Sequence, residues 1–229
     1  MPAADEIAER AVELRGRVDA VAERAGRDPA TVRILAVTKT WPVEVCRAAL
    51  AAGLPMLGEN RVQEAEAKVA ALPDAEWHLV GSLQSNKVRR AVAAFDVIHS
   101  IDSNALVERV ERAAHDARRR PRILLQVNTT AEPQKGGLVA GEALAPALLA
   151  ALRNLRHAQP VGLMTIGRAG GDAHEPFAAL RRLRDELEQR AGVPLPELSM
   201  GMSADWQAAV REGATLLRIG TALFGGRPA

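Results

Sequence analysis

Tyrosine is absent from this chain of 229 residues, and the sequence holds only three phenylalanines and three tryptophans. Aromatic side chains that stack on nucleic-acid bases are therefore scarce. The net charge is only +2, and the arginines are spread along the chain. The densest basic run, residues 118–120, ends a predicted helix, where cations complement the helix dipole. We therefore expect no nucleic-acid partner.

Cysteine and long apolar runs are also scarce. Cys46 is the only cysteine, so a disulfide framework is excluded, and its apolar-periodic segment predicts a buried small side chain. The N-terminus lacks the apolar stretch of a signal peptide, and no run approaches the roughly 20 residues that span a bilayer. We expect a cytoplasmic protein without membrane contact.

Lysine is rare, with four in the chain against an abundance of arginine. Lys39 ends the apolar run 34–39, which Pro42 then stops, and such a run predicts a buried strand. A half-buried amine at a strand end loses hydration, so its pKa falls and it becomes a nucleophile for carbonyls. A lysine that merely reaches into solvent fits the same pattern, and the stretch alone favours that interpretation.

Apolar runs alternate with helix-like periodic segments along the whole chain. The predicted helices lie at 5–25, 42–53, 59–72, from the lead-in segment 81–87 to 94, 103–119, 142–153, from the polar link 167–172 to about 192, and 204–212. The predicted strands lie at 34–39, 55–58, 76–80, 97–100, 122–127, 161–166, within 198–203, and at 214–219. This order favours a single (β/α)8 barrel domain over residues 1–229 with an extra N-terminal helix, and an open doubly wound sheet is the alternative.

The last two strands carry polar residues where a barrel places its active site. Arg218 lies between apolar strand residues and needs an acceptor, and Gly220 and Thr221 follow it with backbone N–H groups and a hydroxyl. Ser203 is placed to cap the helix 204–212, beside a glycine-containing turn. Such a turn favours an anion, notably phosphate. The alternatives are simple N-capping for Ser203 and a structural ion pair for Arg218.

Lys39 supplies an amine that can become a nucleophile, and Ser203, Gly220 and Thr221 supply a phosphate-binding turn, here called the phosphate cup. With Arg218 between them, they describe a site for a phosphorylated carbonyl compound. Pyridoxal 5′-phosphate (PLP) fits all three features. A sugar-phosphate aldolase would also use a barrel lysine and a phosphate cup, but a sugar offers no ring nitrogen to explain Arg218.

Over nearly its whole length the chain resembles the pyridoxal phosphate homeostasis protein family, single-domain relatives of the alanine racemase N-terminal barrel. The matching stretches, in order, are AVTKT (36–40), GENRVQE (58–64), WHLVGSLQSNK (77–87), GLMTI (162–166), LSMGMS (198–203) and RIGTALFG (218–225). The chain departs from the family pattern at Arg61, where an aromatic residue is usual, and at Gln134 and Gly137, where serines are usual. These departures concern surface and loop roles.

The resemblance implies a covalent aldimine between PLP and Lys39, with Arg218 facing the pyridine nitrogen. It implies that the other cofactor-binding residues are Asn60, Met200, Ser203, Gly220 and Thr221. Neither a metal nor a catalytic residue is expected. His78 lies inside the third strand, where a satisfied core histidine is favoured over a pocket residue.

Two functions of different classes fit this site. The first is a carrier that binds PLP reversibly in intracellular PLP homeostasis, without steady turnover, and makes transient contact with PLP-dependent apo-enzymes. The second is a PLP-dependent amino-acid racemase. Racemisation needs bases on both faces of the α-carbon, and in the alanine racemases the second base is a tyrosine from an additional domain. This chain has no tyrosine, which favours the carrier, and we expect it to be a monomer.

Overall fold

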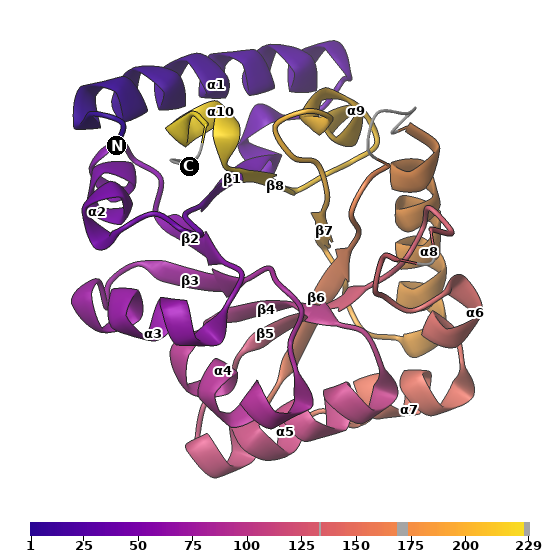
Figure 1. Ribbon diagram of the computed structural model, residues 1–229. Coiled ribbons are helices and arrows are strands. Elements are labelled where there is room, and N and C mark those ends of the chain that lie inside the picture. The colour runs from indigo at the N-terminus through magenta and orange to yellow at the C-terminus, as the bar shows by residue number, and fades with distance from the viewer. Residues whose placement is uncertain (133, 169–173, 227–229) are drawn as a thin grey trace.

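Strands from the whole length of the chain form one closed, parallel barrel (Figure 1). The computed structural model describes residues 1–132, 134–168 and 174–226. Consecutive strands are neighbours, and the last strand pairs with the first, with Arg218 opposite Leu35. The strands are β1 (Arg33–Val37), β2 (Met56–Glu59), β3 (Glu76–Leu79), β4 (Val97–Ile101), β5 (Arg122–Gln126), β6 (Gln159–Met164), β7 (Glu197–Ser199) and β8 (Leu216–Ile219). The predicted (β/α)8 barrel is confirmed.

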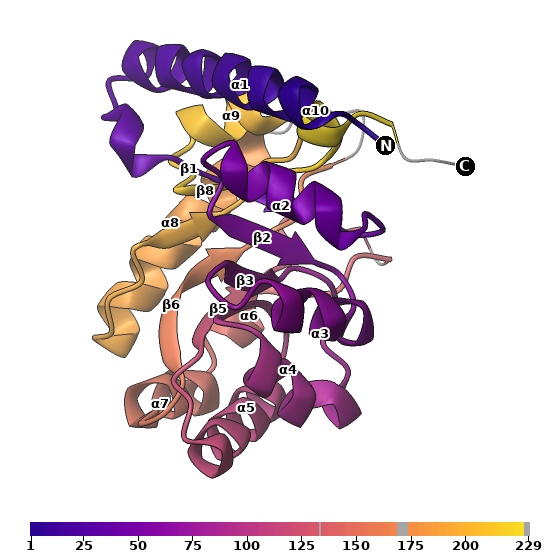
Figure 2. The ribbon, with the colours of Figure 1, turned by 90° about the vertical axis from the view of Figure 1, so that its left-hand side faces the viewer.

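Helices form the outer ring, with at least one between each pair of consecutive strands (Figures 1 and 2). The α-helices are α1 (Ala4–Arg24), α2 (Val43–Ala51), α3 (Val62–Ala71), α4 (Val88–Ala94), α5 (Asn104–Ala117), α6 (Ala140–Ala143), α7 (Pro146–Asn154), α8 (His174–Ala191), α9 (Trp206–Arg211) and α10 (Thr221–Phe224). Two short 3-10 helices, η1 (Pro29–Thr31) and η2 (Ser85–Lys87), complete the described helical segments.

The extra N-terminal helix, α1, lies along the outside of the barrel beside α2, α9 and α10 (Figure 1). Asp5 and Glu6 occupy its first turn, where negative charge complements the helix dipole. Its apolar residues recur every three or four positions, so they share one face. The buried ones are Ile7, Ala11, Leu14, Val18, Val21 and Ala22. The predicted helix 5–25 is therefore confirmed.

Side chains of the strands alternate between two cores, as the pleat of a strand requires. In β8, Leu217 and Ile219 join the large cluster that packs against the helices. Leu216 belongs instead to a small cluster with Leu35 and Met56 inside the barrel. Arg218 lies two residues after Leu216, so it shares the interior face. The same alternation that builds the outer core therefore directs an arginine into the barrel.

Two helices replace the single helix predicted at 142–153. Helix α6 ends at Ala143, and Pro146 occupies the first turn of α7. Because proline has no N–H group, it is tolerated at the start of a helix and breaks a helix that tries to pass through it. Most of the polar link predicted at 167–172 lies outside the described residues.

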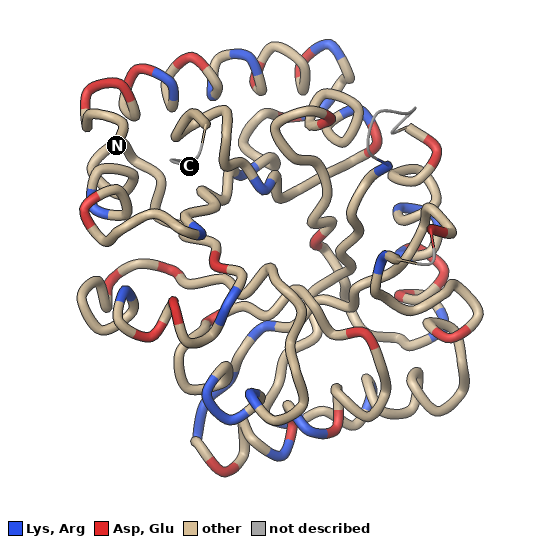
Figure 3. Tube along the Cα trace, in the orientation of Figure 1, with Lys and Arg blue, Asp and Glu red and all other residues tan. Residues whose placement is uncertain are grey.

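Charges of both signs are spread over the outer helices (Figure 3), often as pairs one turn apart such as Glu6 and Arg10. Cys46 is fully buried in α2, as its segment predicts. None of the helices in the described part of the chain combines the length and the apolar character that crossing a bilayer requires.

Candidate functional site

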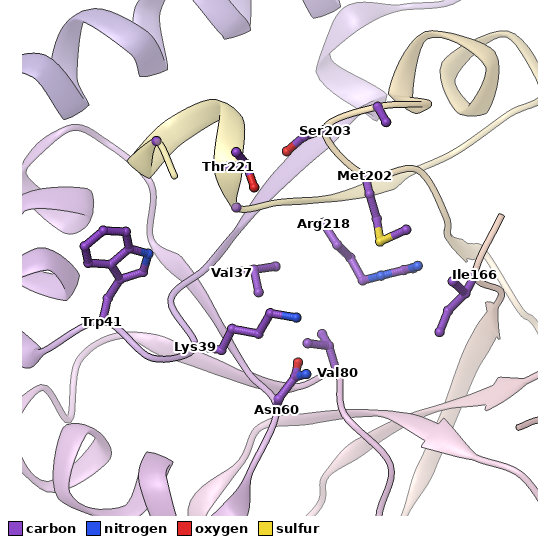
Figure 4. A pocket seen from close by; sticks show the side chains of 13 residues that line it. Val37, Lys39, Trp41, Asn60, Val80, Ile166, Met202, Ser203, Arg218 and Thr221 are labelled. Carbon is purple, nitrogen blue, oxygen red and sulfur yellow. The ribbon is translucent and has the colours of Figure 1, made fainter. Parts of the chain in front are cut away.

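A cavity of about 330 Å³ opens where the carboxyl ends of the strands meet (Figure 4). Its walls come from the ends of six different strands and the segments that follow them, far apart in the sequence. The lining residues are Val37, Lys39, Trp41, Asn60, Val80, Ile166, Met202, Ser203, Ala204, Arg218, Gly220, Thr221 and Gly225. Six of the seven predicted cofactor-site residues line this one cavity.

Lys39 lies in a tight turn just after β1 and is half-buried. The turn is closed by the Trp41 N–H, which donates to the Thr38 carbonyl oxygen at 3.1 Å. Thr40 adopts φ = 68°, a left-handed conformation that non-glycine residues rarely take, and its N–H donates to Oε1 of Glu64 at 2.5 Å. Contacts on both sides of Lys39 therefore fix the backbone from which its side chain enters the cavity (Figure 4).

A buried ion pair lies behind this turn, between β2 and α3. Nζ of Lys68 donates to Oε1 of Glu59 at 2.8 Å, to the Thr38 carbonyl oxygen at 3.1 Å and to Oε1 of Glu64 at 3.1 Å. Burial raises the pKa of Glu59, and the hydrogen bonds from Lys68 and Thr38 partly offset that rise. Burial opposes the charge of Lys68, but its hydrogen bonds to Glu59 and Glu64 raise its pKa. The pair ties α3 to the turn that carries Lys39.

Arg218 finds the acceptors that its place among apolar residues demands. Its Nη1 donates to the carbonyl oxygen and Oγ of Ser199 at 2.6 and 2.8 Å, and its Nη2 donates to the Thr165 carbonyl oxygen at 2.7 Å. Burial lowers the pKa of Arg218 from 12.5 to about 10, so the guanidinium keeps its charge at neutral pH. The hydrogen-bond partners of Arg218 are thus the neutral oxygens of Ser199 and Thr165, and not the carboxylate of an ion pair.

The N-cap predicted for Ser203 is wrong. Helix α9 begins at Trp206 after Asp205, and Oδ1 of Asp205 accepts from the Met202 N–H at 2.6 Å. Ser203 instead faces the start of α10, where its Oγ accepts from the Ala222 N–H at 3.2 Å. The sequence gives no sign of this partner because Ala222 follows a different strand. Ser203 nevertheless lines the cavity beside Thr221 (Figure 4).

Met200 does not line the cavity, contrary to the prediction from resemblance. It is fully buried and belongs to the outer core, whereas Met202 lines the cavity. The strand alternation accounts for the difference, because Ser199 points inward to Arg218 and its neighbour must point outward. Gly201 then turns the chain at φ = 92°, where an added Cβ would come within 2.6 Å of Cβ of Ala209.

Asn60 is the cavity residue that follows β2, and the loop after β3 packs directly on its backbone. A Cβ at Gly81 would lie 2.1 Å from the Asn60 carbonyl oxygen, so this approach requires glycine. Sequence reasoning singled out none of the apolar walls Trp41, Val80 and Ile166. Their positions just after β1, β3 and β6 could have identified them, because residues that follow barrel strands lie at the carboxyl end of the barrel.

His78 is a core histidine, as the sequence favours. It is 1% exposed, and both ring nitrogens have partners, Glu76 and His99. No group of three or more His, Cys, Asp or Glu side chains suited to a metal ion is found within the described residues.

The side chains around the cavity suit an anionic carbonyl compound. Lys39 supplies an amine that can add to a carbonyl, and Arg218 supplies a fixed cation. Ser203 and Thr221 supply hydroxyl groups on the wall above Lys39 in Figure 4. Apolar side chains make up much of the remaining wall, which is typical of a small-molecule site.

Comparison with known proteins places this cavity in a family. The family model "Alanine racemase, N-terminal domain" matches residues 12–228. A pyridoxal phosphate homeostasis protein from Pseudomonas aeruginosa is 44% identical over 223 residues, which is 96% of each chain. A relative of the same name from Aquifex aeolicus is 41% identical over 224 residues, 96% of this chain and 97% of its own.

Solved structures agree with this assignment. PipY from Synechococcus elongatus, solved with and without PLP, is 46% identical and covers 96% of this chain and 100% of its own, with TM-scores of 0.85 and 0.86 respectively. Alanine racemase from Corynebacterium glutamicum shares the fold at a TM-score of 0.74 and 18% identity, over 99% of this chain and 62% of its own. The chain therefore belongs to the pyridoxal phosphate homeostasis protein family, built on the alanine racemase N-terminal domain.

Proposed function

We propose that this chain binds PLP reversibly in the cavity at the carboxyl end of the barrel and so buffers or delivers the cofactor. The observation that carries the proposal is that Lys39 and Arg218 line one cavity together with Ser203, Gly220 and Thr221. A homologue of 46% identity, PipY, has been solved with PLP bound. The relatives from Pseudomonas aeruginosa and Aquifex aeolicus are named for pyridoxal phosphate homeostasis.

The cavity suits the size and chemistry of PLP. Its volume of about 330 Å³ lies at the small end of the range of about 300–1,000 Å³ for ligand pockets. PLP is a flat, anionic aldehyde, which calls for an amine, a cation and hydrogen-bond donors. Lys39, Arg218 and the hydroxyl groups of Ser203 and Thr221 are that set.

The phosphate group belongs at the wall formed by Ser203, Gly220 and Thr221. Because Oγ of Ser203 already accepts from the Ala222 N–H, its own hydrogen is the part left to donate to an anion. Thr221 adds a second hydroxyl on the same wall. Hydrogen bonds to a charged group are worth more than neutral ones, so this wall supplies much of the affinity.

Arg218 belongs at the ring nitrogen of the cofactor. A guanidinium has five N–H donors and no acceptor, and three of its hydrogen bonds go to Ser199 and Thr165, which leaves two N–H groups for a ligand. A permanent donor pairs with an unprotonated ring nitrogen and so weakens the ring as an electron sink. That effect alone does not exclude racemisation, and the missing second base is what favours the carrier.

Lys39 is the covalent anchor in this proposal. PLP supplies an aldehyde carbon, and a lysine amine adds to such a carbon reversibly. The network of Thr38, Thr40 and Glu64 fixes the backbone on either side of Lys39, so the amine reaches the ligand from a rigid turn. Reversible attachment is what a buffering or delivering protein requires.

The carrier role includes expectations about partners and place. Delivery calls for transient contact with PLP-dependent apo-enzymes, and we expect a monomer that works in the cytoplasm. A racemase would need a second base, and the chain has no tyrosine to act as one.

Titrating the purified protein with PLP and recording its absorption tests this function. We expect a visible band that saturates at one PLP per chain, and activation of an added PLP-dependent apo-enzyme as the band declines. Lys39→Ala should lose the band yet keep some affinity, because the phosphate contacts remain. A protein that stays colourless with PLP but binds sugar phosphates would instead support an aldolase.

A further inference from the structure

A row of hydrogen-bonded polar side chains crosses the interior of the barrel. Nε2 of His78 lies 2.7 Å from Oε1 of Glu76, and Nδ1 of His78 lies 2.8 Å from Nε2 of His99. Nδ1 of His99 lies 2.9 Å from Oγ of Ser199, which accepts from Arg218. Five residues from four strands thus form one unbroken chain of contacts.

This row joins the two ends of the barrel. Glu76 is the first residue of β3, at the amino end of the strands, where it also pairs with Arg122 at 2.9 Å. Arg218 lies at the other end and lines the cavity. The row therefore connects a partly exposed carboxylate on one face with the candidate site on the opposite face.

The middle of the row is sealed from water. His99 and Ser199 are 0% and His78 is 1% exposed. Two small apolar clusters separate from the large outer core are also buried, one made of Leu35, Met56 and Leu216 and the other of Val97, Leu124, Val161 and Met164. A buried polar group without a partner is costly, so each member of the row depends on its neighbours.

The two ends of the row fix the direction of every hydrogen bond in it. Arg218 can only donate, and the ionised Glu76 carboxylate can only accept. The Ser199 hydroxyl therefore accepts from Arg218 and donates to Nδ1 of His99. Nε2–H of His99 then donates to Nδ1 of His78, and Nε2–H of His78 donates to Glu76. Both histidines are neutral and protonated at Nε2.

The opposite direction would place a bare Nε2 of His78 against the carboxylate of Glu76, with two acceptors facing each other. A doubly protonated histidine is also disfavoured, because burial lowers the pKa of His78 and lowers that of His99 well below its usual value. The hydrogen bond from His78 in turn lowers the pKa of Glu76 to about 2, which keeps the accepting end ionised.

We infer that Ser199, His99 and His78 are positioning residues that hold Arg218 in one orientation as a donor at the cavity, and that Glu76 polarises the row from the far end of the barrel. Ser199 contacts Arg218 directly, and the two histidines act through Ser199. The effect of the row on a bound cofactor rests on the proposed function, whereas the row itself is a property of the protein alone.

Nitrogen-15 NMR of the cofactor-free protein tests the row. Both Nε2 atoms should show the signal of a protonated ring nitrogen, and both Nδ1 atoms that of an unprotonated one, without titration between pH 5 and 9. A proton on Nδ1 of either histidine, or protonation of either ring in that interval, would overturn the inferred direction. This outcome would leave PLP binding by Lys39 untouched.

Three variants of the PLP-loaded protein test the positioning role. His99→Leu removes both contacts of the ring, His99→Gln keeps one donor and one acceptor, and Val97→Ala perturbs the same interior without removing any hydrogen bond of the row. We expect His99→Leu to shift the visible band and weaken PLP binding roughly tenfold, His99→Gln to recover part of both, and Val97→Ala to change neither. Ser199→Ala replaces His99→Leu if that variant does not fold. A folded His99→Leu or Ser199→Ala variant with unchanged band and affinity would refute the positioning role.

Discussion

Lys68 donates a hydrogen bond at 3.1 Å to the carbonyl oxygen of Thr38, the residue directly before Lys39. The same amine is paired with the buried carboxylate of Glu59 at 2.8 Å. A buried ion pair is thus attached to the backbone of Thr38, next to Lys39, the residue that we propose to hold PLP. Such a pair adds little stability over an apolar substitute, but removing one partner leaves the other charge buried.

We expect Lys68→Met to destabilise the protein by about 3–5 kcal/mol, because Glu59 is left without its counter-charge. The double variant Glu59→Leu/Lys68→Met should recover most of that loss. Lys87→Met serves as the control for removing a lysine elsewhere. Denaturant unfolding measures all three variants, and a Lys68→Met variant that is as stable as the unmodified protein would contradict the role given to the pair.

Low pH should lower the free energy of unfolding, because Glu76 then becomes protonated. Its folded-state pKa is about 2, against an ordinary value of 4.5, chiefly because His78 donates to it. A carboxylate whose pKa is lowered by folding stabilises the fold above its unfolded pKa, and that contribution disappears as the pH falls through the folded pKa. We expect the free energy of unfolding to decline from pH 4.5 towards pH 2. Glu76→Gln should flatten that decline, whereas Asp74→Asn, an exposed neighbour, should leave it intact.

Ser203→Ala should weaken PLP binding by roughly tenfold or more, because it removes a hydrogen bond to the phosphate group. The visible band should keep its position, since Ser203 is not at the ring. Ser85→Ala, an exposed serine on η2, is the matched control. Isothermal titration calorimetry gives the affinities for PLP. Equal affinities of the Ser203→Ala and Ser85→Ala variants would show that Ser203 does not bind the phosphate group.

Steady racemisation of amino acids should not occur. Loss of an essential general base commonly lowers a rate by about 10²–10⁴-fold, and the chain has no tyrosine to supply the second base. Incubation of the loaded protein with L-alanine, followed by chiral analysis and α-deuterium exchange, measures any turnover. Sustained racemisation that Lys39→Ala abolishes would replace the carrier with an enzyme; a spectral change without turnover agrees with the carrier.

Local signals in the sequence were sufficient for most of the fold. Apolar runs that ended at Pro42 or at glycine marked the strands, and Ser103 marked the start of α5, where its side chain accepts from the Leu106 N–H at 3.2 Å. Because the strands are parallel and the barrel closes, Lys39 and Arg218 had to meet at one end. That they share a cavity was therefore predictable from the order of the strands along the chain.

The contacts within the barrel were not predictable in this way. His99 and Ser199 are 100 residues apart in the chain, so nothing local links them. Ser203 has a local alternative, N-capping, and only the three-dimensional arrangement brings Ala222 to it. The turn at Gly201 interrupts the strand alternation, so Met202 lines the cavity while Met200 lies in the outer core, and no local signal separates the two methionines.

Covalent trapping at a single lysine is the most direct test of the central claim. The protein is loaded with PLP, reduced with borohydride and digested, and the pyridoxyl group is located by peptide mass spectrometry. The account predicts that the group lies on Lys39, with little on Lys68, Lys87 or Lys135, and that Lys39→Ala abolishes it. A label mainly on another lysine, or equal labelling in Lys39→Ala, would contradict the claim that the cavity at the carboxyl end of the barrel holds the cofactor through Lys39.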